Sequence, residues 1–238
     1  MKPSKNTSLV LLLFSRLFLF AAFQVLIFLV FLAAGNSSAW EASQGWWTIS
    51  ALCTNNVSIL LLVYLFRKEG LGYLENFRFR KEGRKRDMLI FAGLFLCTGP
   101  IAMLPNFLLS GLLWDSADVP VELMFRDLPL WTILLSFAFP LTIAFAELPT
   151  YFGYIMPRLQ SSMKSTWWPM LIPAFFLALQ HISMPLILDP VFILYRFLMF
   201  LPFALFIGIC VKVRPSLLPY FMIAHGLMDM GTVAMFFM

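Results

Sequence analysis

Four ionisable residues interrupt long apolar stretches of this sequence and are its candidates for chemistry: Glu147, His181, His225 and Asp229. His181 and His225 are the only 2 histidines. Asp229 follows His225 by one helical turn, so on a helix both side chains face the same side. A charge at membrane depth costs several kcal/mol unless it is paired, hydrated or protonated. We therefore expect these residues to share one polar pocket.

The chemistry that such a set supports is hydrolysis. A desolvated carboxylate is a stronger base than one in water, so Glu147 is the candidate for activating a water molecule. His225 and Asp229 are candidates for stabilising an oxyanion. We expect no cofactor; the alternative is zinc held by His181, His225 and Glu147, whose side chains are all zinc ligands. The alternative is a purely structural role, in which each residue only forms hydrogen bonds between helices.

The composition indicates where this pocket lies. The chain is 61% hydrophobic and 12% charged, whereas a soluble domain has about 25% charged residues. Several apolar runs reach the roughly 20 residues that cross a bilayer. The sequence therefore predicts an all-α polytopic membrane protein, which excludes a soluble domain. We expect one integral-membrane domain over residues 1–238, with the motif-bearing part at about 130–238, and three free cysteines that fill the core.

Apolar runs separated by polar loops predict seven transmembrane helices. The first run is too long for a signal peptide, so we expect a retained helix. No internal repeat or pair of broken helices suggests a transporter. The predicted segments are 8–34, 47–66, 88–113, 130–157, 167–188, 191–211 and 217–238.

The basic residues indicate the orientation, because cytoplasmic loops carry an excess of Lys and Arg. A cytoplasmic N-terminus places every basic loop on one side, and only Arg126 falls in a loop on the other. This pattern explains the net charge of +5 by membrane orientation, so we expect no nucleic-acid partner. The groups on the predicted inner side are Lys2 and Lys5, the loop 67–87, Arg158 and Lys164, and Lys212 and Arg214.

The loop 67–87, from Arg67 to Asp87, allows two interpretations. Leu71, Leu74 and Phe77 recur at helical spacing, which indicates an amphipathic helix lying beside anionic lipid headgroups. The alternative is a solvated loop that only sets the topology.

The predicted orientation also permits an estimate of depth at about 1.5 Å per residue. Glu147, His181 and His225 then lie at similar depth on the fourth, fifth and seventh segments. We predict one polar cavity between these helices, reaching the cytoplasmic side. Arg16 is expected to face other helices or to snorkel. Arg196 is expected to snorkel or pair near the outer surface, away from the site.

The stretch around Glu147 resembles the first motif of a known family, the CAAX-protease and bacteriocin-processing (CPBP, or Abi) intramembrane proteases. That motif is Glu-Glu-x-x-x-Arg, commonly followed by Gly. Glu147 matches its first Glu and Gly153 its Gly. Leu148 stands at the position of the second Glu, and Phe152 at that of the Arg.

The other two motifs of the family follow in order on later segments. His181 matches the His of Phe-x-x-x-His, with Leu177 at the Phe position. His225 and Asp229 match His-x-x-x-Asn/Asp. The resemblance implies that Glu147 activates water, that His181 assists, and that His225 with Asp229 forms the oxyanion site.

The resemblance thus implies an intramembrane endopeptidase that cleaves a membrane-proximal or lipid-modified peptide, in an integral membrane protein that we place in a bacterial cell membrane. Its partner would be a peptide or protein substrate at the membrane. Because of Leu148 and Phe152, two alternatives stay open. One is a membrane scaffold or regulator without proteolytic activity, and the other is an acyl- or lipid-group transferase that uses the same cavity.

Overall fold

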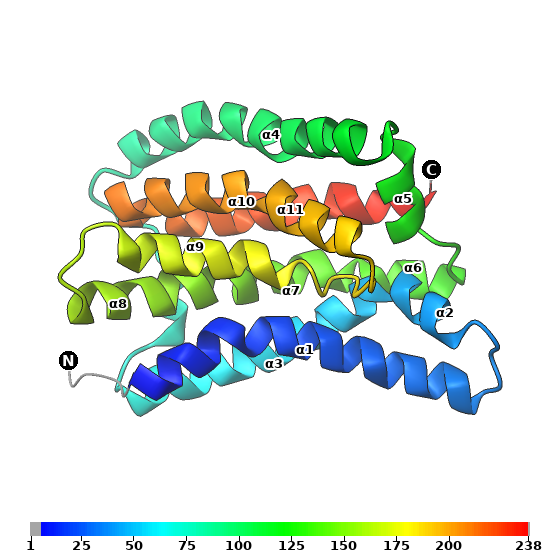
Figure 1. Ribbon diagram of the computed structural model, residues 1–238. Coiled ribbons are helices and arrows are strands. Elements are labelled where there is room, and N and C mark those ends of the chain that lie inside the picture. Colours follow the sequence, from blue (N-terminus) through cyan, green and yellow to red (C-terminus); the bar gives the residue numbers. More distant parts are fainter. Residues whose placement is uncertain (1–5, 238) are drawn as a thin grey trace.

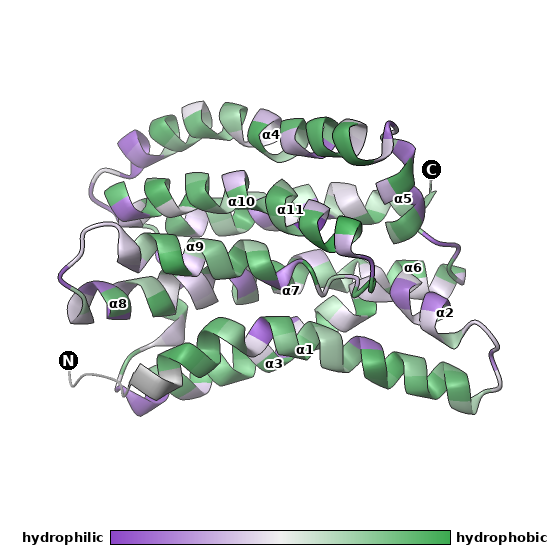
Figure 2. Ribbon diagram, viewed as in Figure 1, coloured by the Kyte–Doolittle hydropathy of each residue, from purple (hydrophilic) through white to green (hydrophobic). Residues whose placement is uncertain are grey.

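The computed structural model describes residues 6–237 of the chain, and every regular element among them is a helix. Within residues 6–237, six helical spans are long and apolar enough to cross a membrane (Figures 1 and 2). This confirms an all-α polytopic membrane protein. Lys2 and Lys5 lie outside the described residues. The single-helix spans are α1 (Asn6–Ala33), α3 (Trp47–Lys68), α4 (Arg84–Trp114) and α10 (Pro190–Val213); α11 (Leu218–Ala234) forms most of the last span, Pro215–Phe237.

The fourth predicted segment is assembled from four short pieces. These are α6 (Leu130–Ser136), α7 (Ala138–Leu148), the π-helical turn η2 (Pro149–Ile155) and α8 (Met156–Ser162). Proline lacks a backbone N–H, which interrupts regular α-helical bonding, and Pro149 begins η2. π-helical turns inside helices are frequent at functional sites. Here the turn follows Glu147 directly.

The fifth predicted segment is shorter than expected. Its helix, α9 (Trp168–Gln180), ends eight residues before the predicted boundary at residue 188. A proline disfavours helical backbone at the residue before it, and Pro185 follows Met184. His181 therefore caps the end of α9 inside the bundle. The chain then runs to Asp189, whose carboxylate accepts hydrogen bonds from the backbone N–H groups of Val191 and Phe192 and begins α10.

The basic loop between α3 and α4 does not form the amphipathic helix. It contains one turn of 3₁₀ helix, η1 (Tyr73–Phe77). Tyr73 is buried, whereas Leu71 and Leu74 are exposed. Arg158, expected in the next basic loop, belongs instead to α8 and is buried against Glu69.

The buried apolar residues of the described part of the chain form two clusters. One contains residues of α1, α3, η2, α9, α10 and α11, and the other contains Trp47, Phe139 and Phe192. The short helices α2 (Ala39–Gly45) and α5 (Asp118–Met124) lie at the end of the bundle that holds Trp47. Helix α4 packs mainly on α10 and forms the edge of the bundle in Figure 1.

Candidate active site

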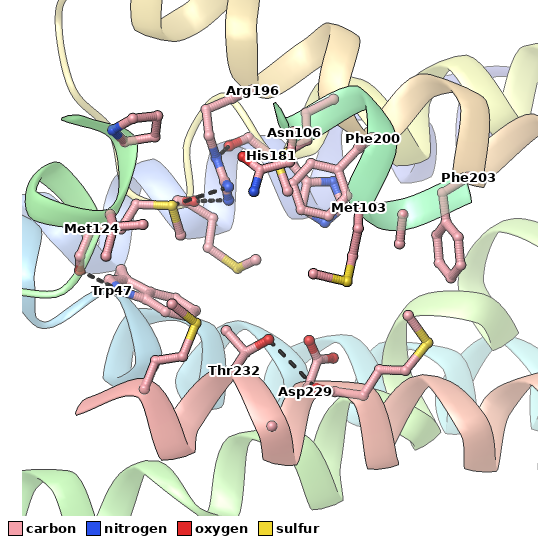
Figure 3. A pocket seen from close by; sticks show the side chains of 18 of the residues that line it. Trp47, Met103, Asn106, Met124, His181, Arg196, Phe200, Phe203, Asp229 and Thr232 are labelled. Carbon is pink, nitrogen blue, oxygen red and sulfur yellow. Dashed lines mark hydrogen bonds between the residues drawn. The ribbon is translucent and has the colours of Figure 1, made fainter. Parts of the chain in front are cut away.

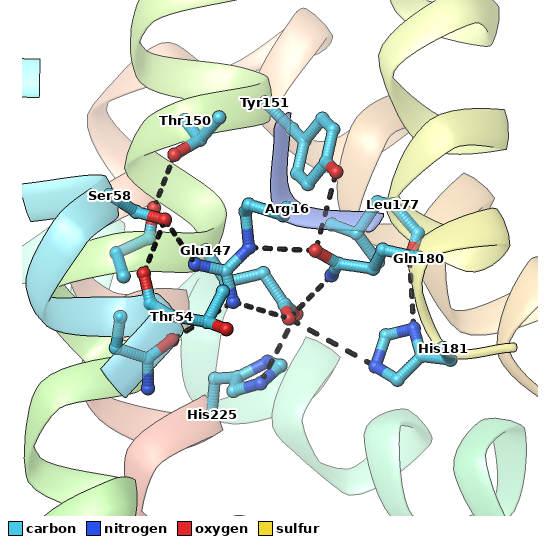
Figure 4. Close-up of polar contacts among 12 residues, drawn as sticks. Arg16, Thr54, Ser58, Glu147, Thr150, Tyr151, Leu177, Gln180, His181 and His225 are labelled. Atoms are coloured by element: carbon cyan, nitrogen blue, oxygen red, sulfur yellow. Dashed lines mark hydrogen bonds and ion pairs between the residues drawn. The ribbon is translucent and has the colours of Figure 1, made fainter. Parts of the chain in front are cut away.

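Glu147 is fully buried at the end of α7, and its two carboxylate oxygens have different surroundings (Figure 4). Oε2 accepts a hydrogen bond of 2.6 Å from the Gln180 side-chain amide and lies 3.6 Å from the guanidinium of Arg16. Oε1 lies 3.4 Å from Nε2 of His225 but has no hydrogen-bond partner among the described residues. One oxygen is therefore held in place, and the other is buried without a hydrogen bond.

The His181 ring is oriented by its own helix. Its Nδ1 lies 2.8 Å from the carbonyl oxygen of Leu177, one turn earlier in α9. A carbonyl only accepts hydrogen bonds, so Nδ1 carries the proton when His181 is neutral. Nε2 is then an acceptor, and it faces Glu147 Oε2 at 4.0 Å. The ring also stacks on Phe200, which fixes its plane.

His225 and Asp229 lie on the same face of α11, as their spacing predicts. Nε2 of His225 is 3.1 Å from Oδ2 of Asp229 and 3.4 Å from Glu147 Oε1. Neither contact has the geometry of a hydrogen bond. Glu147 Oε1 and Asp229 Oδ2 both have no hydrogen-bond partner among the described residues. A proton on Nε2 would therefore stand between two carboxylates. The structure thus brings all four predicted residues together in one site.

Two site residues escaped the sequence analysis, Arg16 and Gln180. Arg16 does face other helices, as expected, but it also contacts the site. Its guanidinium donates to Gln180, Ser58 and Asn55 at 2.7, 3.1 and 2.9 Å. It is the only charged residue of α1, and that isolation was the available signal.

Gln180 connects this cation to the carboxylate. Its amide oxygen accepts from Arg16 Nε, and its amide nitrogen donates to Glu147. The Tyr151 hydroxyl, from η2, donates to the same amide oxygen at 3.3 Å. Glu147 is thus held by a hydrogen-bonded network and a counter-charge, which a buried carboxylate requires.

Close helix contact brings His225 to Glu147. A β-carbon on Gly226 would lie 2.9 Å from the backbone carbonyl oxygen of Pro140, so α11 approaches α7 as closely as glycine allows. Leu148 and Phe152, at the positions of the family's second Glu and Arg, are buried in the apolar cluster. Phe152 packs against Gly208 of α10.

A cavity of about 570 Å³ opens beside the site and is lined mainly by apolar side chains (Figure 3). His181, His225 and Asp229 lie in its wall, but Glu147 does not. The prediction of a polar cavity lined by Glu147 was therefore wrong, because the Glu147 carboxylate lies behind the two histidines in contact with Gln180 and Arg16.

From the histidines, the cavity extends toward Trp47 and α5, the end of the bundle opposite the basic loops. The expectation that the pocket reaches the basic, predicted cytoplasmic end was therefore wrong. Depth along a helix does not reveal on which side neighbouring helices leave space.

Arg196 also differs from its expectation. It is buried rather than snorkelling, and it lines the cavity beside His181. Its guanidinium donates to the backbone carbonyl oxygens of Met184 and His181. Arg196 therefore reaches the depth of the site, because the early end of α9 leaves free carbonyl groups there.

Among residues 6–237, no cluster of three or more His, Cys, Asp or Glu side chains has the arrangement of a metal site. Glu147, His181 and His225 are adjacent, but Arg16 lies beside the same carboxylate. A fixed cation at this distance opposes the binding of a second positive charge.

Residues 129–231 match the family model for type II CAAX prenyl endopeptidases, Rce1-like. The matched segment contains all four predicted site residues. It confirms, over this part of the chain, the resemblance indicated by the three motifs. The chain matches no curated protein and no solved structure.

Proposed function

From this relationship to CAAX endopeptidases, we propose that the protein is a membrane-embedded endopeptidase in which Glu147 activates water. The proposal rests on the difference in hydrogen bonding between the two carboxylate oxygens of Glu147. Oε2 is held by Gln180, while Oε1 lacks a hydrogen-bond partner among the described residues and faces His225. A general base needs an oxygen whose hydrogen-bonding capacity is free for the water proton that it takes.

The other site residues have complementary roles in this mechanism. Nε2 of His181 would accept a hydrogen bond from the second hydrogen of the same water, which stays on the attacking oxygen. The water oxygen attacks the scissile carbonyl, its proton moves to Glu147, and His225, supported by Asp229, stabilises the oxyanion. Glu147 then returns the proton to the leaving amine as the C–N bond breaks. Arg16 and Gln180 hold the carboxylate in place throughout.

The activation of water is proposed to need no metal. Zinc held by His181, His225 and Glu147 is the competing mechanism, and such a metal would polarise the carbonyl or the water. The Arg16 charge beside Glu147 supports the metal-free alternative.

The proposed substrate is a membrane-proximal or lipid-modified peptide. An apolar cavity beside the catalytic residues would hold apolar side chains or a lipid chain during cleavage. The membrane is proposed to be a bacterial cell membrane. Anionic lipids are proposed to contact the basic residues between Arg67 and Asp87.

A second candidate is a non-proteolytic relative. The burial of Leu148 and Phe152 in the core favours it, because neither supplies the polar group present in the family motif. Such a protein would act as a membrane scaffold or regulator, or would transfer an acyl or lipid group in the same cavity.

Substitution of Glu147 distinguishes these functions. With a quenched-fluorescence peptide that ends in a prenylated CAAX sequence, we expect Glu147→Gln and Glu147→Asp to lower cleavage at least about 100-fold, the scale of general-base catalysis. Glu147→Asp keeps the charge beside Arg16, so its loss of activity would not reflect an unpaired cation. Both variants must retain the wild-type unfolding midpoint. Undiminished cleavage by either folded variant contradicts the proposal, and inhibition by a chelator that zinc reverses would establish the metal mechanism.

A further inference from the structure

The loop 67–87 crosses one end of the bundle and packs aromatic side chains against it. It joins α3 to α4, which lie at opposite edges of the bundle in Figure 1. The ring of Phe77 lies 4.8 Å from the ring of Phe145 in α7. The ring of Phe79 lies 4.8 Å from that of Tyr220 in α11. The loop is therefore docked on α7 and α11, two helices of the candidate site.

Two further contacts of the docked loop lie on either side of Glu147 in the sequence. The Tyr73 hydroxyl donates to the backbone carbonyl oxygen of Phe145. In a regular α-helix this carbonyl accepts from the N–H four residues later, but that residue is the proline that begins η2, which has no N–H. A β-carbon on Gly153, in η2, would lie 2.7 Å from Oδ1 of Asn76, so the loop is also in close contact with η2. The docked loop thus holds the backbone before and after Glu147.

The outer side of the loop is strongly basic. Arg78 has extended backbone, and successive side chains of an extended segment point to opposite sides. Phe77 and Phe79 accordingly pack on the bundle, while Arg78 and Arg80 are exposed. The loop has eight exposed basic side chains and two exposed acidic ones. The exposed basic residues are Arg67, Lys68, Arg78, Arg80, Lys81, Arg84, Lys85 and Arg86.

The chemistry of this surface matches an anionic membrane. Leu71, Leu74 and Phe79 are exposed among the basic side chains. Apolar groups combined with Lys and Arg are typical of segments that lie in the headgroup layer of a membrane. The loop also lies directly between the spans α3 and α4, which places it at the membrane surface. Both observations favour an anionic phospholipid over a nucleic acid or an acidic protein.

We propose that anionic phospholipid bound to the loop 67–87 stabilises the docked form of the loop and thereby positions Glu147. The docked loop presents Arg78 and Arg80 on one side in advance, whereas an undocked loop would lose conformational entropy on binding. A lipid with this difference in affinity shifts the population toward the docked form. The inference rests on the proposed contact of anionic lipids with this loop, and it adds that the contact regulates the candidate site.

The test compares the protein in phosphatidylcholine nanodiscs with the protein in nanodiscs that also contain phosphatidylglycerol. Hydrogen–deuterium exchange over residues 72–79 and 146–155 reports docking and does not depend on cleavage. In the wild type, phosphatidylglycerol should slow exchange in both segments at least about fivefold, the effect of one basic residue at an anionic surface. The double variant Arg78→Gln with Arg80→Gln should lose this response. Arg78→Lys with Arg80→Lys should keep most of it, because the charge is retained.

Phe77→Ala separates lipid binding from its effect on the site. It leaves every basic side chain in place, so the phosphatidylglycerol retained by the purified protein, counted by native mass spectrometry, should equal that of the wild type. Exchange over residues 146–155 should no longer respond to the lipid, because the contact with Phe145 is lost. Lys164→Gln is the control for the loss of a basic residue, since Lys164 is exposed at the same end of the bundle but outside the loop. It should respond like the wild type.

Equal exchange of the wild type in the two lipid mixtures would overturn the inference, as would an undiminished response of the Arg78→Gln, Arg80→Gln variant. Slower exchange with polyglutamate but not with phosphatidylglycerol would assign the surface to an acidic protein instead. If Glu147 is the catalytic base, cleavage of the prenylated peptide should rise with phosphatidylglycerol as exchange slows. Lipid-dependent exchange without any cleavage contradicts only the endopeptidase function, and cleavage that does not depend on the lipid contradicts only this inference.

Discussion

At the scale of single residues, the site depends on how each buried charge is compensated. Glu147 has Arg16, a hydrogen bond from Gln180 and two nearby imidazoles. The partners come from helices far apart in the sequence, so a change in one residue leaves another without compensation. Breaking a buried pair from one side is therefore more harmful than removing both charges.

Arg16→Met tests this coupling. We expect a loss of about 3–5 kcal/mol in the free energy of unfolding, because Glu147 would be left buried without its partner. The double variant Arg16→Met with Glu147→Gln should recover a large part of that loss and stay inactive. Denaturant unfolding in detergent measures both effects. Additive losses in the double variant would show that the two residues do not interact.

At the scale of elements, two contacts between helices position the site. Gly226 lets α11 approach α7, which sets the distance from His225 to Glu147. The side chain of Glu69, just after α3, connects that helix to α8 by accepting hydrogen bonds from Arg158 and Tyr154. Both contacts hold the α7–α8 segment that carries Glu147.

Gly226→Ala should separate α11 from α7, because the new methyl group meets a backbone oxygen that cannot rotate away. We expect activity to fall about 10- to 100-fold, since small displacements of catalytic groups have such effects. Gly111→Ala, on α4, has open space around the added carbon and lies outside the cavity, so it should retain activity. Full activity of Gly226→Ala would show that the close contact does not position His225.

The contact between α3 and α8 should depend on pH. Burial raises the pKa of Glu69, but hydrogen bonds from Arg158 and Tyr154 outweigh it, so the net pKa lies below the ordinary value of 4.5. The contact therefore stabilises the fold fully above that value and is lost as the pH falls through the lower, folded-state pKa. Between about pH 6 and about pH 3, Glu69→Gln should lose less thermal stability than the wild type. Glu75→Gln, at an exposed position, should behave like the wild type; an identical pH dependence in all three proteins would contradict the prediction.

At the scale of the whole molecule, the two ends of the bundle differ in character. The ion pairs Glu69–Arg158 and Asp87–Arg214 lie at the end with the basic loops. Trp47 stacks with Phe236 at the other end, and the cavity extends toward it. If the basic end is cytoplasmic, as the charge distribution predicts, the cavity lies in the outer half of the membrane.

Cysteine labelling tests this orientation. Arg84→Cys and Asp118→Cys place thiols near opposite ends of α4. With an impermeant maleimide, we expect position 84 to react only from the cytoplasmic side and position 118 only from outside. Labelling of position 84 in intact cells would invert the orientation and place the cavity on the cytoplasmic side.

The sequence by itself determined most of the spans and the meeting of the candidate site residues. Long apolar runs must cross the bilayer as helices, since no other open structure satisfies the backbone there. Glu147, His181 and His225 are each too costly to face lipid, so their convergence followed from matched depth. The three motifs pointed to the same residues, and the family match contains them.

The tertiary structure alone decided which other groups join them and where the cavity opens. The roles of Arg16 and Gln180 depend on the rotation of α1 and α9, and hydropathy does not report rotation when a helix is apolar on all sides. The early end of α9 exposes the carbonyl groups that hold Arg196 inside the bundle. The direction of the cavity depends on how closely helices pack, and contacts such as Gly226 against Pro140 arise only once distant segments are side by side.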